Sequence, residues 1–184
     1  MDWNTFQKQS SGLYDKLYNS HVEYYNFWKN NIVFTWRWWI TLLLILTPWI
    51  IWLLIKKKES TDRLLYAGFF VMVSSSIMDM TGVAMGLWRY PITVFPFMSQ
   101  HIAFDIFALP GVTMLLIQWF RSISPYIKAV IYSLSSSFIF DPFIEWLGLY
   151  KQLHWKYYYS VPIMFFLYLL ANYISSRNEF EKLK

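Results

Sequence analysis

Five long apolar runs, joined by short polar connections, limit what this chain can fold into. They cover approximately residues 34–55, 64–88, 101–120, 126–147 and 158–174. About 20 residues in a helix that rises about 1.5 Å per residue cross a hydrocarbon core of about 30 Å. Backbone polar groups in lipid must be satisfied within the protein, which favours helices. The sequence therefore predicts an all-α integral membrane bundle of about five transmembrane helices.

The composition agrees with a membrane class and excludes some partners. The chain is 57% hydrophobic and only 15% charged, whereas soluble domains are about 25% charged. The net charge of +5 comes from Lys and Arg that flank the apolar runs, not from a basic patch of the type that binds nucleic acid. We expect membrane lipid as the surrounding partner and no nucleic acid. The absence of cysteine excludes disulfides and thiolate metal sites.

The first 33 residues precede the apolar runs and have a different pattern. Aromatic and apolar side chains recur there in steps of three or four, at Tyr14, Leu17, Tyr18, His21, Tyr25 and Trp28. This pattern predicts an amphipathic helix, either lying in the membrane interface or docked on the bundle. We expect three parts: the N-terminal helix at 1–33, the transmembrane bundle at 34–176 and a charged tail at 177–184.

The distribution of Lys and Arg indicates the orientation in the membrane. Nine of the 16 basic residues would lie on the side that carries Lys56, Lys57 and Lys58, and seven on the other. Cytoplasmic loops carry the excess of Lys and Arg. The sequence predicts a multi-pass protein of the cell membrane with its N-terminus outside and its C-terminus in the cytoplasm.

Four acids lie inside the apolar runs: Asp79, Asp105, Asp141 and Glu145. When the runs are threaded back and forth through a bilayer, all four fall in the outer leaflet. Each costs about 2.5–3.5 kcal/mol to insert, so intramembrane acids mark functional sites. His101 and Asp105 are four residues apart, as are Asp141 and Glu145, which places each pair on one helix face. We predict an acid-rich cavity with these five residues as catalytic candidates.

Proline next to the acids predicts irregular helices. Pro142 follows Asp141, disfavours a helical residue before it and leaves the carbonyl of Phe138 without its usual donor. The step Pro110–Gly111 predicts a similar bend in the third run. Irregular backbone at membrane depth is tolerated where it borders protein or a water-filled cavity. The proline positions and the acids therefore point to the same cavity.

The first functional hypothesis is acid–base chemistry on a lipid or isoprenoid, or binding of one. A protonated carboxyl beside an ionised one can act as acid and base, and aromatic rings stabilise cations. We expect Asp141 or Glu145 as the general acid, His101 as the group that sets its protonation, and Arg89 as a partner for an anionic head group or an acid. The predicted substrate-binding residues are Trp88, Arg89, Tyr90, Trp146 and His154.

Two alternatives stay open at this stage, and the sequence does not decide whether the protein is an enzyme. His101, Asp105, Asp141 and Glu145 carry the nitrogen and oxygen ligands that suit a divalent metal, although no HExxH motif is present. The other alternative is a metal- or proton-binding transporter, or a non-catalytic membrane subunit in a homo-oligomer or with a partner subunit.

Three short runs carry a resemblance to known proteins. GLWRYP at 86–91, FDIFALP at 104–110 and FDPFIEWLGLY at 140–150 resemble a family of small multi-pass membrane proteins of spore-forming Firmicutes, over residues 60–175. This resemblance implies the topology and no activity. The outer acids and the Trp88-x-Tyr90 step are more distantly similar to integral-membrane lycopene and terpene cyclases, which protonate an isoprenoid with a carboxylic acid. The number of spans differs from theirs.

Overall fold

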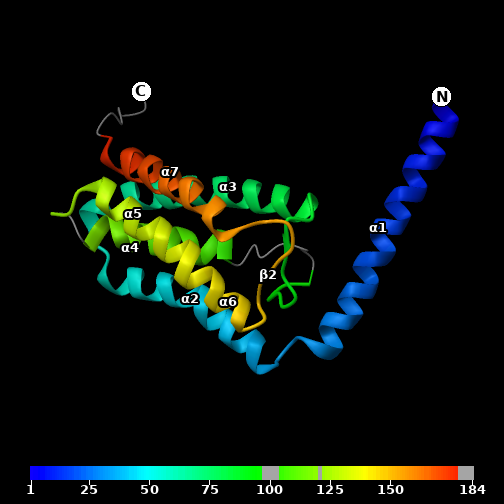
Figure 1. The fold of residues 1–184 in the computed structure, drawn as a ribbon, viewed down its shortest axis with the longest axis horizontal. Coiled ribbons are helices and arrows are strands. Elements are labelled where there is room, and N and C mark those ends of the chain that lie inside the picture. Colours follow the sequence, from blue (N-terminus) through cyan, green and yellow to red (C-terminus); the bar gives the residue numbers. More distant parts are fainter. Residues whose placement is uncertain (97–103, 120–121, 178–184) are drawn as a thin grey trace.

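The computed structural model describes residues 1–96, 104–119 and 122–177, and this part of the chain is mainly helical. The helices are α1 (Trp3–Asn31), α2 (Trp36–Ile55), η1 (Lys58–Ser60), α3 (Thr61–Ala84), η2 (Phe104–Ala108), α4 (Leu109–Trp119), α5 (Pro125–Ser135), η3 (Ser136–Phe140), α6 (Asp141–Trp146) and α7 (Tyr157–Ser176). Two short strands, β1 (Trp88–Arg89) and β2 (Lys151–Gln152), form an antiparallel ribbon. The predicted all-α class is confirmed (Figure 1).

The described residues include four helical stretches that are long and apolar enough to cross a membrane. They are Trp36–Ile55, Lys58–Ala84, Pro125–Trp146 and Tyr157–Ser176. The predicted third run corresponds to a shorter apolar helix, Phe104–Trp119. The membrane class of the chain therefore follows from four helices. The remaining predicted span, the third along the chain, corresponds to the shorter helix.

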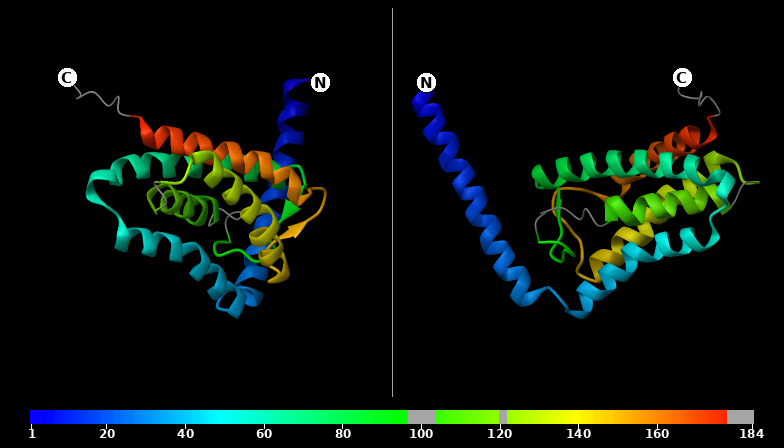
Figure 2. Two further views of the ribbon diagram at one scale, coloured as in Figure 1. Left: turned by 60° about the vertical axis from the view of Figure 1, so that its left-hand side comes forward. Right: turned by 180° about the vertical axis from the view of Figure 1, so that it is seen from behind.

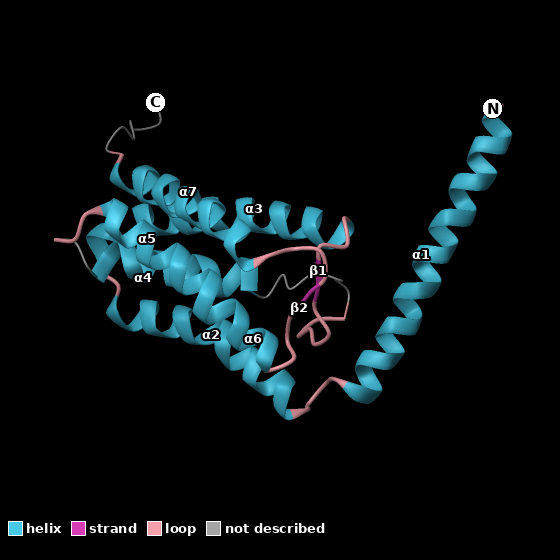
Figure 3. Cartoon of the chain, in the orientation of Figure 1, coloured by secondary structure: helices cyan, strands magenta, loops and turns pink. Residues whose placement is uncertain are grey.

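The stretches α2, α3, η2–α4, α5–α6 and α7 run in alternating directions along the chain (Figures 1 and 3). One end of the bundle carries the start of α2 and the β1–β2 ribbon, and the other end carries η1 and the end of α7. The α4 helix packs against α2 and α3, as seen from the side in Figure 2. Asp79 near the end of α3, Asp105 in η2 and Asp141 at the start of α6 all lie toward the ribbon end. We call this the ribbon end, and the other the lysine end, after Lys56, Lys57 and Lys58.

Small residues allow the helices of the core to approach one another. Ala67 of α3 and Ala171 of α7 are fully buried in a cluster shared by the two helices. On α4, a Cβ atom at Gly111 would lie only 2.8 Å from the Cβ of Pro48 in α2. Without a hydrophobic driving force in lipid, close packing of small residues is a main source of helix association.

The N-terminal helix α1 extends away from the bundle and crosses its direction (Figure 1). None of its residues is buried. It begins after Asp2, whose side chain accepts a hydrogen bond from the Thr5 N–H at 2.9 Å, a common N-cap. Near its other end, the Tyr24 hydroxyl lies 2.8 Å from the Thr93 hydroxyl, and the Trp28 Nε1–H donates to the Thr93 carbonyl at 2.9 Å. Both of these hydrogen bonds join the helix to Thr93, a loop residue of the bundle.

The predicted irregularities at the prolines are wide helical turns of the π type. They occupy η2 and η3, and each ends two residues before a proline, Pro110 or Pro142. Proline cannot donate the hydrogen bond that a regular helix needs, and a π turn changes the pairing in just this region. The helix continues past Asp141 as α6, so the chain is re-paired there and not broken. Turns of this type are frequent at functional sites.

Candidate functional site

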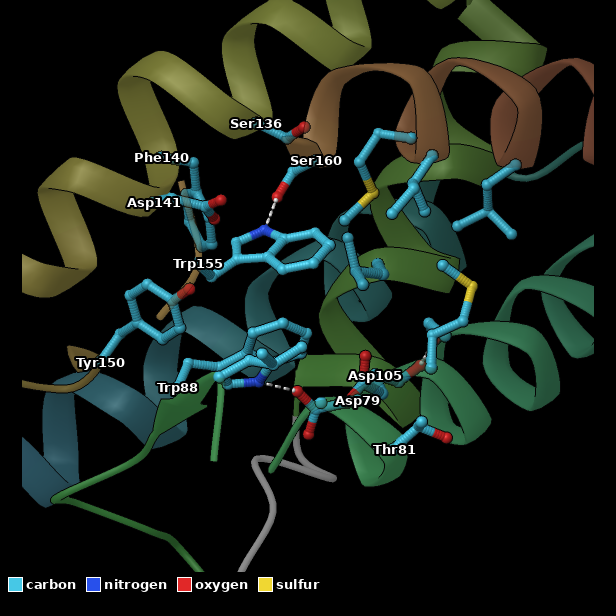
Figure 4. A pocket seen from close by; sticks show the side chains of 18 of the residues that line it. Asp79, Thr81, Trp88, Asp105, Ser136, Phe140, Asp141, Tyr150, Trp155 and Ser160 are labelled. Carbon is cyan, nitrogen blue, oxygen red and sulfur yellow. Dashed lines mark hydrogen bonds between the residues drawn. The ribbon is translucent and has the colours of Figure 1, made fainter. Parts of the chain in front are cut away.

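A cavity of about 400 Å³ lies at the ribbon end of the bundle. Its wall consists mainly of apolar and aromatic side chains from α3, α4, α6, α7 and the segments beside the ribbon. Asp79, Asp105 and Asp141 also line it (Figure 4). Small-molecule sites typically enclose about 300–1,000 Å³ and combine apolar walls with a few polar groups. The cavity therefore has the size and composition of a ligand site.

Asp79 is fixed by two side chains of the ribbon segment. Its Oδ1 accepts hydrogen bonds from Trp88 Nε1 at 2.8 Å and from the Tyr90 hydroxyl at 2.6 Å. Trp88 and Tyr90 alternate with Arg89 at the start of an extended segment, and alternate residues of a strand share a face. Arg89 is accordingly exposed and does not line the cavity. Two of the predicted substrate-binding residues thus orient an acid.

The Tyr90 hydroxyl is held as a proton donor. Burial, and then the negative charge of Asp79, raise the pKa of Tyr90 well above its ordinary value of 10.0. A neutral phenol can donate to a carboxylate, whereas a phenolate cannot. The Tyr90–Asp79 hydrogen bond is therefore expected to persist over the whole physiological pH range.

Asp105 lies beside Asp79, and both are only 6% exposed. The Asp105 carboxyl group is close enough to the Asp79 carboxyl group and to Ser75 for these groups to affect its charge. Ser75 Oγ also lies 3.3 Å from the Asp105 carbonyl oxygen, to which it donates. A hydrogen bond between two carboxyl groups requires a proton on one of them, because ionised carboxylates only accept. We call Asp79 and Asp105 the inner pair; its geometry can hold one shared proton.

Asp141 and Glu145, the outer pair, have different surroundings. Asp141 is half-buried on the cavity wall, and the described part of the chain offers its carboxyl group no hydrogen-bond or ion-pair partner. Glu145 does not line the cavity. It accepts a hydrogen bond from the Tyr157 hydroxyl and lies 3.5 Å from Lys151 Nζ. Of this pair, only Asp141 is available to a ligand in the cavity.

Two further predicted site residues, Trp146 and His154, lie away from the cavity. His101 falls outside the described residues. Trp146 is 78% exposed on α6 and does not line the cavity. His154 is exposed, with its Nδ1 at 3.2 Å from the Gly86 carbonyl oxygen, where it helps to join the two segments of the ribbon. With Arg89, three of the five predicted binding residues are therefore absent from the lining.

Several lining residues were not among the predicted site residues, chiefly Trp155 and Tyr150. The Trp155 ring packs edge-on against Trp88 with ring centres 5.2 Å apart, and its Nε1–H donates to Ser160 Oγ at 2.9 Å. The ribbon register, Trp88 opposite Gln152, brings these distant segments together. The sequence places Trp155 only ten residues after Glu145, which could have indicated a site residue. The pairing of its segment with Trp88 could not be predicted, because a strand of two residues has no recognisable sequence pattern.

Three of the four predicted metal ligands, Asp105, Asp141 and Glu145, lie within the described residues and do not form one set, whereas His101 lies outside them. Among residues 1–96, 104–119 and 122–177, no group of three or more His, Asp or Glu side chains could hold a metal ion. Asp105 belongs to the inner pair, and Glu145 is engaged by Tyr157 and Lys151. The described acids thus form two pairs with separate partners instead of one ligand set.

Comparison with known proteins identifies no relative of this chain. No protein-family model, no curated protein and no solved structure matches the chain. The resemblance to the Firmicutes membrane family and the more distant likeness to the cyclases therefore stay predictions.

Proposed function

We propose that this membrane protein binds a lipid or isoprenoid in the ribbon-end cavity and performs acid–base chemistry on it, with Asp141 as the acid. The observation that carries the proposal is the carboxyl group of Asp141 on the wall of a largely apolar cavity of about 400 Å³. A carboxyl group in apolar surroundings is costly unless a partner compensates it. The described protein supplies no such partner, and a polar or basic group of a bound lipid would do so.

The three cavity acids have separate roles in this proposal. Asp141 gives a proton to the reacting group of the lipid or takes one from it. The inner pair holds a second proton in a fixed place, with Asp79 oriented by Trp88 and Tyr90. Rings of Trp88, Trp155 and Phe140 also line the cavity (Figure 4), and aromatic faces stabilise positive charge. An alkene would find a proton donor in Asp141, and the carbocation that forms when it takes this proton would find cation-stabilising walls.

Access from the lipid phase supports an apolar ligand. Ile77 and Met78 of α3 line the cavity and are 59% and 37% exposed. Across from them, Ile163 and Met164 of α7 also line it. Nearer the lysine end, α3 and α7 are held in contact by Ala67 and Ala171. A lipid chain could therefore enter sideways between α3 and α7 without leaving the membrane.

The same proposal includes the full topology. Phe104–Trp119 is apolar and lies among the longer helices, which supports it as a fifth, short span. The unburied α1, which crosses the direction of the bundle, supports an interfacial helix at the ribbon end. Lys56, Lys57 and Lys58 at the lysine end support a cytoplasmic C-terminus of this cell-membrane protein.

Native mass spectrometry of the detergent-purified protein tests ligand binding. We expect a lipid to remain bound to the wild type and to be lost from Asp141→Asn. Asp62→Asn is the matched control, because Asp62 is exposed at the start of α3 and does not line the cavity; it should keep the lipid. If the wild type and Asp141→Asn both lack a lipid and are equally stable, the proposal is wrong, and proton transport or a subunit interface becomes the better account of the acids.

Deuterium transfer tests the chemistry separately. The identified lipid is incubated with the protein in heavy water and extracted, and its deuterium content is measured by mass spectrometry. Acid–base chemistry at carbon adds deuterium to the lipid with the wild type and not with Asp141→Asn. A lipid that binds but gains no deuterium would show that the cavity binds without reacting.

A further inference from the structure

The structure has a second cavity, of about 330 Å³, at the lysine end of the bundle. It lies between α3, α4, α5 and α7, and its lining includes Arg63, Gln118, Lys128, Asn172 and Ser175. From these residues we infer a binding site for an anionic phospholipid whose head group carries a hydroxyl, as in phosphatidylglycerol. This inference is independent of the chemistry proposed for the ribbon end.

The positive charges of the cavity call for an anion. Lys128 is only 5% exposed, and its Nζ donates to the Leu116 carbonyl oxygen at 3.3 Å. Arg63 is exposed at the rim. Neither cation has a carboxylate within 4.0 Å in the described part of the chain. A buried ammonium group with one neutral acceptor is poorly compensated, and phosphate oxygens between Lys128 and Arg63 would complete it.

Gln118 supplies an independent sign of a ligand. It is 8% exposed, and its Nε2 donates to the Ile55 carbonyl oxygen at 2.9 Å. This bond fixes which end of the amide is the oxygen, because only the NH₂ group can donate. The Oε1 atom is buried and has no hydrogen-bond partner among the described residues. An unpaired buried acceptor costs about 1–3 kcal/mol, so a ligand that donates a hydroxyl would satisfy it.

The place of the cavity favours a lipid over a soluble anion. Leu64, Ile117 and Ile123 line it together with the polar groups, which gives a surface for the first part of the acyl chains. It lies at the ends of spanning helices, beside Lys56, Lys57 and Lys58, the cluster that the positive-inside rule places in the cytoplasm. Basic pockets between helices on this side of a membrane bind anionic head groups. The N-termini of α3 and α5 at the same end add partial positive charge.

Titration of the delipidated protein in detergent tests this site. The bound species are counted by native mass spectrometry with phosphatidylglycerol, with phosphatidylcholine or with inorganic phosphate. We expect one phosphatidylglycerol molecule to bind, and Arg63→Gln to weaken this binding about tenfold, the effect of about one charge-assisted hydrogen bond. Lys58→Gln removes a neighbouring exposed charge that does not line the cavity and should change the affinity less than twofold.

The outcomes separate the sources of the anion. Equal binding of phosphatidylcholine, or equal weakening by Lys58→Gln, would overturn the site and leave only general attraction between charges and lipid. Displacement of the lipid by inorganic phosphate at similar concentration would make it a free-anion site. Phosphatidylmethanol, which has the phosphate and no head-group hydroxyl, should bind more weakly than phosphatidylglycerol; equal affinity would overturn the role of Gln118.

Discussion

The two acid pairs at the ribbon end differ in what surrounds them, although both consist of carboxyl groups in apolar segments. The inner pair joins α3 to η2 and is held by the neutral donors Trp88 and Tyr90. The outer pair lies on one helix but is divided, with Asp141 facing the cavity and Glu145 facing Lys151 and Tyr157. Helical spacing places two acids on one face, but the packing of the next segment decides what each one meets.

The largest expected effect is the loss of the inner acceptor. Asp79→Ala leaves the Trp88 indole N–H and the Tyr90 hydroxyl without their acceptor. Buried donors left unpaired cost about 1–3 kcal/mol each, so we expect the free energy of unfolding to fall by about 3 kcal/mol. Unfolding in detergent micelles measures it. Asp79→Asn keeps an oxygen acceptor and should lose less than half as much. Wild-type stability of Asp79→Ala would show that the two donors do not depend on Asp79.

The next effect concerns the space that Trp88 needs beside α3. A Cβ atom at Gly82 would lie 2.0 Å from Cζ2 of Trp88, so Gly82→Ala must displace the ring from Asp79. Overpacking of this kind costs about 1–3 kcal/mol. Gly12→Ala is the matched control, because nothing lies within 4 Å of that position on α1. The same unfolding measurement should show destabilisation for Gly82→Ala and none for Gly12→Ala; wild-type stability of Gly82→Ala would contradict the observed packing.

The contrast between the pairs also marks what the sequence could predict. Apolar length predicted the helices, and the antiparallel order of the runs placed Asp79, Asp105 and Asp141 toward one end. Pairing of Asp79 with Asp105 depends on how η2 packs against α3. The donors to Asp79 lie on the segment that begins with β1, whose two residue pairs with β2 leave no periodic pattern. The partner of Glu145 is Tyr157, which lies beyond the connection to the next helix, and helical spacing cannot predict a contact of that kind. The prediction of a fifth span from apolar length alone is also weakened, because the helix Phe104–Trp119 is shorter than the other four.

A smaller effect is expected in the pH dependence of the free energy of unfolding, to which Tyr90 beside the inner pair contributes. Burial, and then the Asp79 charge, raise the pKa of Tyr90 in the folded protein above 10.0, so the unfolded chain loses this proton first. The stabilisation is complete below pH 10 and is lost as the pH rises, by at most about 1.4 kcal/mol per pH unit for one group. Between about pH 9 and pH 11, Tyr90→Phe should unfold with a shallower pH dependence than the wild type. Identical pH dependence of the two proteins would mean that burial and Asp79 do not raise the pKa of Tyr90.

The smallest effect is expected at the outer pair. The Lys151 side chain is 56% exposed and that of Glu145 23%, and ion pairs near water contribute about 0–1 kcal/mol. Lys151→Gln should therefore lower the free energy of unfolding by about 0.5 kcal/mol, and 1 M salt should remove most of the difference. Because Glu145 does not line the cavity, the same variant should keep the bound lipid that Asp141→Asn loses. A loss of lipid in Lys151→Gln would show that Glu145 and Asp141 act together at the ligand, and the division of the outer pair would then be wrong.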